Sequence, residues 1–291
     1  MTTTHAQSRA HRWRSSLETI CRVLVHSNLF ISLATMSVVV TTVVLADLPL
    51  EPIPLFIVFG ATLFVYTVNR FTDLEEDEEN VPDRAAFTKR YGRLLLGIGI
   101  CCYLGAIGAA VVLGVPGAIY LLLPLVAAVL YSVGGIKRLL LVKNLFVGVA
   151  WGLLPLGVGY YYNSLWTPEI LFLAGYMTAM ITIAAVIFDI KDIEGDRAEG
   201  IATVPNTVGV PWTRRLSQAG NVVVVATAVL VIVTTTALSS VFLVVLAMNA
   251  YVACYIPFAT AERGPLFYGF VVDGEHVFLA ALVIALEFVL W

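Results

Sequence analysis

Two clusters of oxygen-bearing side chains recur in this sequence at intervals of three or four residues. They consist of Asn69, Asp73 and Asp77, and of Asp189, Asp192 and Asp196. Residues at these intervals share one face of an α-helix, so each cluster predicts a stripe of ligand oxygens. Carboxylates so close together repel one another and stay ionised only where cations bridge them. Oxygen-only ligand sets of this kind suit Mg²⁺, which completes its shell with water and substrate phosphates.

The glutamates beside the first cluster have a simpler explanation. They lie between residues 75 and 79, and a run of charges where a helix leaves an apolar segment is usually a solvated face. An EF-hand over residues 73–84 is excluded, because Glu78 stands where that loop needs glycine and Arg84 where it needs a bidentate acid. The metal-site hypothesis therefore depends on the two spaced clusters.

The composition places these clusters in a membrane protein. Of the 291 residues, 59% are hydrophobic and 13% are charged, and the mean hydropathy is +0.91. A soluble domain has about 45–50% apolar and about 25% charged residues, so a water-soluble fold could not cover this surface with charge. The net charge of −3 gives no indication of a nucleic-acid partner, and none is expected.

Apolar segments long enough to cross a bilayer predict an all-α, multi-pass transmembrane bundle of about nine helices. The candidate spans are 27–46, 53–70, 94–113, 117–134, 143–162, 169–189, 219–238, 240–258 and 273–291. The first is too long for a signal-peptide core and is interpreted as a retained helix. Residues 1–26 then form an N-terminal segment, and residues 27–291 form a single transmembrane domain.

The distribution of basic residues predicts the orientation. With nine spans, all 17 lysines and arginines fall on the side that holds the N-terminus and the segments 70–93, 135–143, 190–218 and 259–272. Cytoplasmic loops carry such an excess, so the N-terminus is expected in the cytoplasm. Both aspartate clusters lie on this side. The loops 71–93 and 190–218 are expected to cap a site at the cytoplasmic face of the cell membrane.

At this point the residues show a resemblance to a known family. Asn69-x₃-Asp73-x₃-Asp77 and Asp189-x₂-Asp192-x-Glu194-Gly195-Asp196 resemble the two aspartate-rich motifs of the UbiA superfamily of intramembrane prenyltransferases. The flanking segments that share the resemblance are Pro82-Asp83-Arg84, Tyr131-Ser132 with Lys137-Arg138, Asn144, Gly148 and Gly152, and Arg197-x₂-Gly200-x₂-Thr203-Val204-Pro205-x₃-Gly209. Together they cover about residues 65–210 in order. One departure is Arg70, which stands where many members have an acid.

The resemblance implies an activity. It implies Mg²⁺-dependent transfer of a prenyl group from an allylic prenyl diphosphate to a lipophilic acceptor. The acceptor would enter from the bilayer, among the membrane lipids. The reaction would proceed by ionisation of the diphosphate and capture of the carbocation. The acceptor classes left open are a quinone precursor, another aromatic ring, an archaeal-type glycerol lipid and a carotenoid.

The resemblance also implies roles for particular residues. Asp73, Asp77, Asp192 and Asp196 would be the principal metal ligands and catalytic residues, and Asn69 and Asp189 would complete or orient the metal shell. The substrate-binding candidates are Arg84, Lys137, Lys191, Tyr131, Arg138 and Asn144, with Lys143 in support. For Arg138 and Lys143, simple anchoring by the positive-inside rule is an equal alternative. Tyr66 and Tyr131 could stabilise the cation or serve only packing, and His26 and Asn28 could face the acceptor.

Another class of function stays open. A membrane transporter or a lipid-binding scaffold with a divalent-metal site could also carry acidic clusters. Transporters place their charges near the bilayer midplane in broken helices, whereas these clusters stand at helix ends on one side, which favours the enzyme. A CDP-alcohol phosphotransferase also uses aspartates and Mg²⁺, but its Asp-Gly…Ala-Arg…Gly…Asp…Asp pattern is not found in this sequence.

Overall fold

The computed structural model describes residues 16–132, 139–198, 200–264 and 266–290, and in these ranges the regular structure is entirely helical. Within these ranges, seven helices are long and apolar enough to cross a membrane. An eighth span would combine Ser16–His26 with Leu29–Leu45, which meet at a bend of 74°. The predicted all-α membrane bundle is confirmed. The count of nine stays a prediction, because the fourth expected span is the shorter apolar helix Ala118–Leu130.

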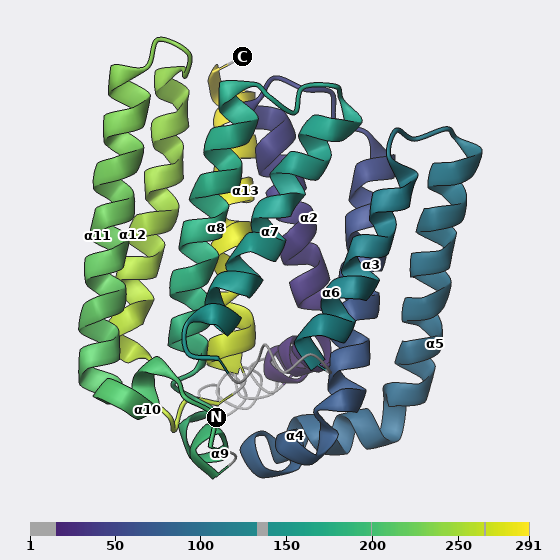
Figure 1. Cartoon of the computed structure of the whole chain (residues 1–291), viewed down its shortest axis with the longest axis vertical. Helices are drawn as coiled ribbons and strands as arrows, with labels where there is room; N and C mark the ends of the chain where they lie inside the picture. Colours follow the sequence, from purple (N-terminus) through teal and green to yellow (C-terminus); the bar gives the residue numbers. More distant parts are fainter. Residues whose placement is uncertain (1–15, 133–138, 199, 265, 291) are drawn as a thin grey trace, which may run out of the picture.

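The long elements run along the vertical axis of Figure 1. They are α2 (Leu29–Leu45), α3 (Pro52–Thr72), α5 (Pro82–Val112), η1 (Ala118–Leu122) with α6 (Leu123–Ser132), α7 (Val142–Tyr161), α8 (Pro168–Phe188), α11 (Val210–Thr234), η3 (Ser240–Val245) with α12 (Leu246–Tyr255), and α13 (Gly274–Leu290). The short ones are α4 (Leu74–Asn80), α9 (Ile193–Ala198), α10 (Val204–Val208), η4 (Ile256–Phe258) and the π-helix η5 (Phe267–Val272).

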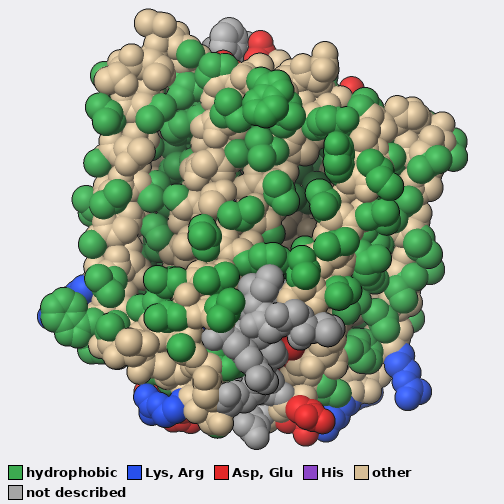
Figure 2. All heavy atoms as spheres, viewed as in Figure 1, with side chains coloured by type: hydrophobic (Ala, Val, Ile, Leu, Met, Phe, Trp, Pro, Cys, Tyr) green, Lys and Arg blue, Asp and Glu red, His purple; other side chains and the backbone are tan. Residues whose placement is uncertain are grey.

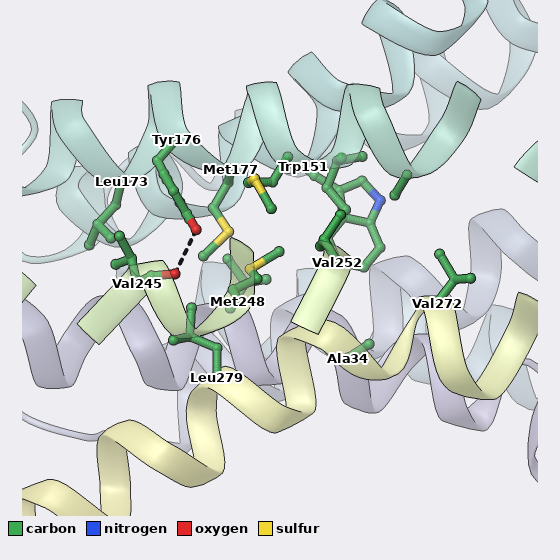
Figure 3. Close-up of a cluster of buried hydrophobic side chains, with 14 of the residues drawn as sticks. Ala34, Trp151, Leu173, Tyr176, Met177, Val245, Met248, Val252, Val272 and Leu279 are labelled. Carbon is green, nitrogen blue, oxygen red and sulfur yellow. Dashed lines mark hydrogen bonds between the residues drawn. The ribbon is translucent and has the colours of Figure 1, made fainter. Parts of the chain in front are cut away.

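The interior of the bundle is filled where α2, α7, α8, α12 and α13 meet. Figure 3 shows Ala34, Trp151, Met177, Met248 and Leu279 facing one another there, and each is buried. The hydroxyl of Tyr176 donates to the carbonyl of Val245 at 2.7 Å, so even the polar tip of a core side chain has a partner. The outward faces of α5, α11 and α13 instead expose large apolar side chains, as helices in lipid do.

Two glycines on one face of α7 allow it to approach α8 closely. A Cβ atom on Gly148 would lie 2.2 Å from Thr182 Oγ1 and 2.6 Å from the carbonyl oxygen of Thr178. One on Gly152 would lie 2.0 Å from Thr178 Oγ1. Small residues spaced in this way are how membrane helices reach short separations. The close approach brings the N-terminal end of α7 beside the C-terminal end of α8, where the second aspartate cluster begins.

The segments expected as cap loops contain helices. Residues 71–93 form α4 and the beginning of α5, while residues 190–218 form α9, α10 and the beginning of α11. All of these lie at the lower end of Figure 1, where α4 contacts α9. Hydropathy alone missed these helices because they are polar and short. On the face drawn in Figure 2, the lysines and arginines also gather at this end.

The described chain begins and ends at opposite ends of the bundle. The helix Ser16–His26 lies at the lower end, and α13 runs from there to the upper end. A chain that crosses the membrane an odd number of times has its two ends on opposite sides, so this arrangement agrees with an odd number of crossings. That the lower end faces the cytoplasm stays a prediction.

Candidate functional site

Both aspartate clusters line one cavity of about 350 Å³ at the lower end of the bundle. Its polar lining consists of Asn28, Asn69, Arg70, Asp73, Asp77, Arg84, Lys143, Asn144, Asp189, Lys191, Asp192, Asp196 and Asp273. The structure therefore brings together all six residues of the two clusters, from segments more than a hundred residues apart. It places three of the proposed substrate-binding residues, Arg84, Asn144 and Lys191, in the same wall.

The first cluster is organised around a buried carboxylate. Asp77 accepts hydrogen bonds from Nε of Arg84 at 2.8 Å and from Nη2 of the same guanidinium, so the pair is bidentate. Nη1 of Arg70 lies 3.7 Å from Asp77 Oδ2. Asp73 sits where α3 ends and α4 begins, and it is half-buried. Two guanidinium groups thus converge on one aspartate.

Arg70, noted in the sequence as a departure from the resemblance, lines the cavity. Its Nε donates to Asn28 Oδ1 at 3.4 Å, and the amide of Asn28 donates to Thr67 Oγ1 at 3.3 Å. Asn28 has a left-handed backbone with φ of 61°, at the bend before α2. Of the two residues expected near an acceptor, Asn28 lines the cavity. His26 is buried outside its lining, with its ring 5.7 Å from that of Phe87.

The second cluster is organised around a buried lysine. Lys143 Nζ lies 2.9 Å from Asp189 Oδ1 and 3.5 Å from Asp196 Oδ2. Asn144, the next residue of α7, donates from Nδ2 to Asp189 Oδ2 at 3.0 Å. Lys143 was as readily explained as a membrane anchor, but it lies in the cavity wall between two aspartates. Asp192 pairs with the adjacent Lys191.

Burial raises the pKa of the Asp189 carboxyl, while the neighbouring charge of Lys143 and the hydrogen bond from Asn144 lower it. The burial effect is the larger one. Lys143 supplies a positive charge beside Asp189 that favours its ionised form. A divalent ion close to this carboxylate would have the same effect.

In this arrangement Asp77, Asp189, Asp192 and Asp196 contact cations of the chain. Among the described residues, no three histidine, cysteine or acidic side chains stand close enough to hold a metal ion. The chemistry of the lining nevertheless fits Mg²⁺, because all the candidate donors are oxygens and the acids outnumber the bases. The buried Oδ1 of Asn144 accepts no hydrogen bond in the described part of the chain, so an unused oxygen donor faces the same site.

Three predicted residues are not placed. Lys137 and Arg138 lie outside the described residues. Tyr131 is at the end of α6, but its side chain lies outside what the structure describes. Tyr66, the other aromatic candidate, lines the cavity.

Above its polar end the cavity has an apolar wall that sequence reasoning only partly anticipated. Trp151, Phe188 and Tyr268 join Tyr66 in this wall, and Ala127, Ala128, Phe146 and Ala150 line the part between α6 and α7. The face of the molecule in Figure 2 is hollowed over this gap between α7 and α6. The cavity is therefore amphipathic, with charge at one end and aromatic rings at the other.

Asp273 is the acidic lining residue that the cluster spacing did not reveal. It stands between η5 and the start of α13, far in sequence from both clusters. One signal could have found it. The last apolar span begins with Asp273 and also contains Glu275 and His276, and ionisable residues within a membrane helix are functional candidates by default.

Comparison with known proteins gives a consistent picture of the fold. The sequence model of the UbiA prenyltransferase family matches residues 28–287. A UbiA homologue from Aeropyrum pernix K1, solved in its apo form, superposes with a TM-score of 0.63 at 18% identity and covers 89% of this chain and 98% of its own. A UbiA homologue from Archaeoglobus fulgidus bound to DMAPP and Mg²⁺ gives 0.59 at 12% identity, over 90% of this chain and 98% of its own.

A third solved structure concerns digeranylgeranylglyceryl phosphate synthase in membranes. It superposes with a TM-score of 0.52 at 17% identity and covers 92% of this chain and 97% of its own. At such identities the likeness concerns the fold. No curated protein sequence matches this chain.

Proposed function

The chain belongs to the UbiA prenyltransferase family, and we propose that it transfers a prenyl group from an allylic diphosphate to a lipophilic acceptor at the cavity between its two aspartate clusters. Family membership makes prenyl transfer in a membrane the general activity. One observation carries the specific assignment. Two acidic clusters from distant segments form the polar end of a single cavity whose other end is apolar and aromatic.

The polar end is proposed to hold the diphosphate. Asp73, Asp77, Asp192 and Asp196 would hold Mg²⁺, with Asn69, Asp189 and the unused Oδ1 of Asn144 available to complete the shell. The bound metal would supply charge neutralisation for the diphosphate. The archaeal homologue solved with DMAPP and Mg²⁺ supports this pairing of ligands for the family fold.

The chain's own cations are proposed to assist departure of the diphosphate. Arg70, Arg84, Lys143 and Lys191 all line the cavity, and each now contacts an aspartate. Cleavage of the C1–O bond leaves its electron pair on the diphosphate, so groups that meet this growing negative charge lower the barrier. A diphosphate between the clusters would give these cations a second anionic partner.

The apolar end is proposed to hold the prenyl tail and to protect the allylic cation. Tyr66, Trp151 and Tyr268 present aromatic groups there, and aromatic faces attract cations by about 0.5–2 kcal/mol. Water would quench the cation, so an apolar wall favours capture by the intended acceptor. The hollow between α6 and α7 offers a route from the bilayer for both lipids.

The test is a transfer assay on the purified full chain in lipid nanodiscs. Labelled geranylgeranyl diphosphate and Mg²⁺ are incubated with 4-hydroxybenzoate, homogentisate, a prenylated glycerol phosphate or a carotenoid, and products are identified by mass. A prenylated product that requires Mg²⁺ and disappears with EDTA is expected. Tight binding of the donor without any product would instead support the alternative, a lipid-binding scaffold or transporter with a metal site.

The proposed site faces the cytoplasm. In a background with the four native cysteines replaced by serine, single cysteines at Glu75 and Glu194 should be labelled from the cytoplasmic side. A cysteine at Glu169, at the opposite end of α8, should be labelled from the other side. Labelling of positions 75 and 194 from opposite sides would exclude a site shared by the two clusters.

A further inference from the structure

Asp273 differs from Asp77, Asp189, Asp192 and Asp196 because no cation of the described residues forms an ion pair with it. Among the described residues its carboxylate makes no hydrogen bond or ion pair, although it lines the cavity near Arg70 and Lys191. Asp77, Asp189, Asp192 and Asp196 each contact a lysine or arginine. A carboxylate whose oxygens are engaged by cations is a poor proton acceptor, whereas one with free lone pairs can take a proton.

The backbone before Asp273 is unusual and directs this residue into the cavity wall. Residues Phe267–Val272 form a π-helix, and the amide of Asp273 donates to the carbonyl of Tyr268 at 3.3 Å, an interval of five residues. A single turn of this kind inserts one residue relative to an α-helix and occurs frequently at functional sites. Tyr268, one turn earlier, lines the same wall.

Contacts at the start of α13 hold Asp273 in place. Glu275 is fully buried, and its Oε2 accepts a hydrogen bond from the hydroxyl of Tyr255 at 2.8 Å. The ring of His276 packs against that of Trp151, with centroids 4.7 Å apart and planes tilted by 31°, and Trp151 belongs to the aromatic wall of the cavity. The carboxylate of Asp273 is thus held beside the aromatic groups proposed to surround the allylic cation.

From this placement we infer that Asp273 is a catalytic residue, the proton acceptor of the transfer reaction. This inference rests on the proposed function. C1 of the prenyl donor loses its bond to the diphosphate oxygen, whose electron pair leaves with the diphosphate. C1 then bonds to the nucleophilic oxygen or carbon of the acceptor. The proton that the acceptor must release passes to the Asp273 carboxylate, which becomes a neutral acid and returns the proton to water after product departure.

Ionisation of the donor and removal of the acceptor proton depend on different residues. Ionisation of the donor needs the aspartate clusters and the metal, whereas proton removal needs Asp273. Asp273→Asn keeps the size of the side chain and removes its basicity. It should therefore spare donor binding and ionisation and impair transfer alone. General-base catalysis contributes about 10²- to 10⁴-fold, so transfer should fall by at least about 100-fold.

Two measurements on the full chain in nanodiscs separate these steps. Ionisation without acceptor is followed by positional exchange of oxygen-18 from the bridging to the non-bridging positions of labelled geranylgeranyl diphosphate with Mg²⁺. Transfer is followed with whichever of the four acceptors the wild-type chain uses. Asp273→Asn should keep isotope exchange within about threefold of wild type while transfer falls at least about 100-fold. Asp273→Glu, which retains a displaced carboxylate, should restore part of the transfer.

Glu262→Gln is the matched control, because Glu262 is an exposed acid on the same side of the molecule and outside the cavity lining. It should leave both rates unchanged. Transfer by Asp273→Asn within about fivefold of wild type overturns the inference. So does a parallel loss of exchange and transfer in both the Asn and Glu variants, which would make Asp273 a donor-site or folding residue. A wild-type chain that neither exchanges nor transfers overturns the proposed function, and the inference with it.

Discussion

The two aspartate clusters occupy one cavity but are held by different kinds of cation. In the first cluster, the guanidinium of Arg84 donates two hydrogen bonds to Asp77, and Arg70 approaches the same carboxylate. In the second, one ammonium group, that of Lys143, lies between Asp189 and Asp196. A guanidinium fork is planar and directional, whereas an ammonium is a compact point charge on a flexible stem. The first cluster is therefore the more rigidly paired, and the second is the one whose carboxylates a metal can most readily take over.

The clusters also differ in what supports them. The second lies beneath the glycine-mediated contact between α7 and α8, so its geometry depends on two long helices of the bundle. The first lies on the short helix α4 and the end of α3, where Arg70 reaches across to Asn28. Similar spacings in sequence can thus serve unlike roles. Both clusters are proposed to contribute metal ligands. We expect the second to contribute more to metal affinity, and we expect Asp77 of the first also to orient Arg84 toward the diphosphate.

The largest expected effect is on metal binding when the second cluster loses a carboxylate. Asp192→Asn should weaken Mg²⁺ binding by at least about 100-fold, because removing a group that merely orients a metal ligand already costs about 10- to 100-fold. The measurement is isothermal titration of Mg²⁺ into the chain loaded with a non-hydrolysable donor analogue. Asp77→Asn is measured alongside. Equal losses in the two variants would abolish the distinction between the clusters.

The support of the second cluster can be tested without touching a charge. Gly152→Ala places a Cβ atom 2.9 Å from the carbonyl oxygen of Ala174, so α7 and α8 must separate. Overpacking of this kind costs about 1–3 kcal/mol, and the separation should weaken the Asn144–Asp189 hydrogen bond and, with it, Mg²⁺ affinity. Thermal unfolding in nanodiscs and Mg²⁺ titration report the two effects.

The control for this substitution lies on the same helix. Gly157→Ala meets no atom within 4 Å, so its melting temperature and its Mg²⁺ affinity should stay at the wild-type values. If both alanine variants behave alike, the close contact between α7 and α8 does not position the second cluster.

Local patterns in the sequence account for the parts of this site that were predicted. The aspartate spacings and the apolar spans depend on helical periodicity and on hydropathy, both of which are read within one segment. The cation that pairs with each carboxylate depends instead on how helices meet, so Lys143 remained ambiguous until α7 was placed against α8. Asp273 belongs to neither spaced cluster, and its π-helix has no signature in hydropathy. The helices α4 and α9 were expected as loops because their residues are too polar for any apolar window.

The role of the first cluster predicts a smaller effect that should appear in donor binding. Asp77→Asn removes the charge that orients Arg84, so the affinity for the prenyl diphosphate should fall by about tenfold, or about 1.4 kcal/mol, while Mg²⁺ affinity changes less. Competition binding with labelled donor measures this change. Glu78→Gln on the same helix breaks only the exposed pair with Lys89 and serves as the control. Such pairs contribute about 0–1 kcal/mol, so a comparable loss of donor affinity in this control would contradict the role of Asp77.

The smallest expected effect concerns Arg70, which approaches Asp77 and donates to Asn28. Arg70→Lys keeps the positive charge near Asp77 but cannot reproduce the Nε hydrogen bond to Asn28 Oδ1. One net hydrogen bond contributes about 0.5–1.5 kcal/mol, so donor affinity should fall by about threefold. Arg70→Gln, which removes the charge, should cost more if the guanidinium meets the diphosphate. Equal affinities in the Lys and Gln variants would show that Arg70 serves only to hold Asn28 at the bend before α2, and the first cluster would then offer Arg84 alone to the donor.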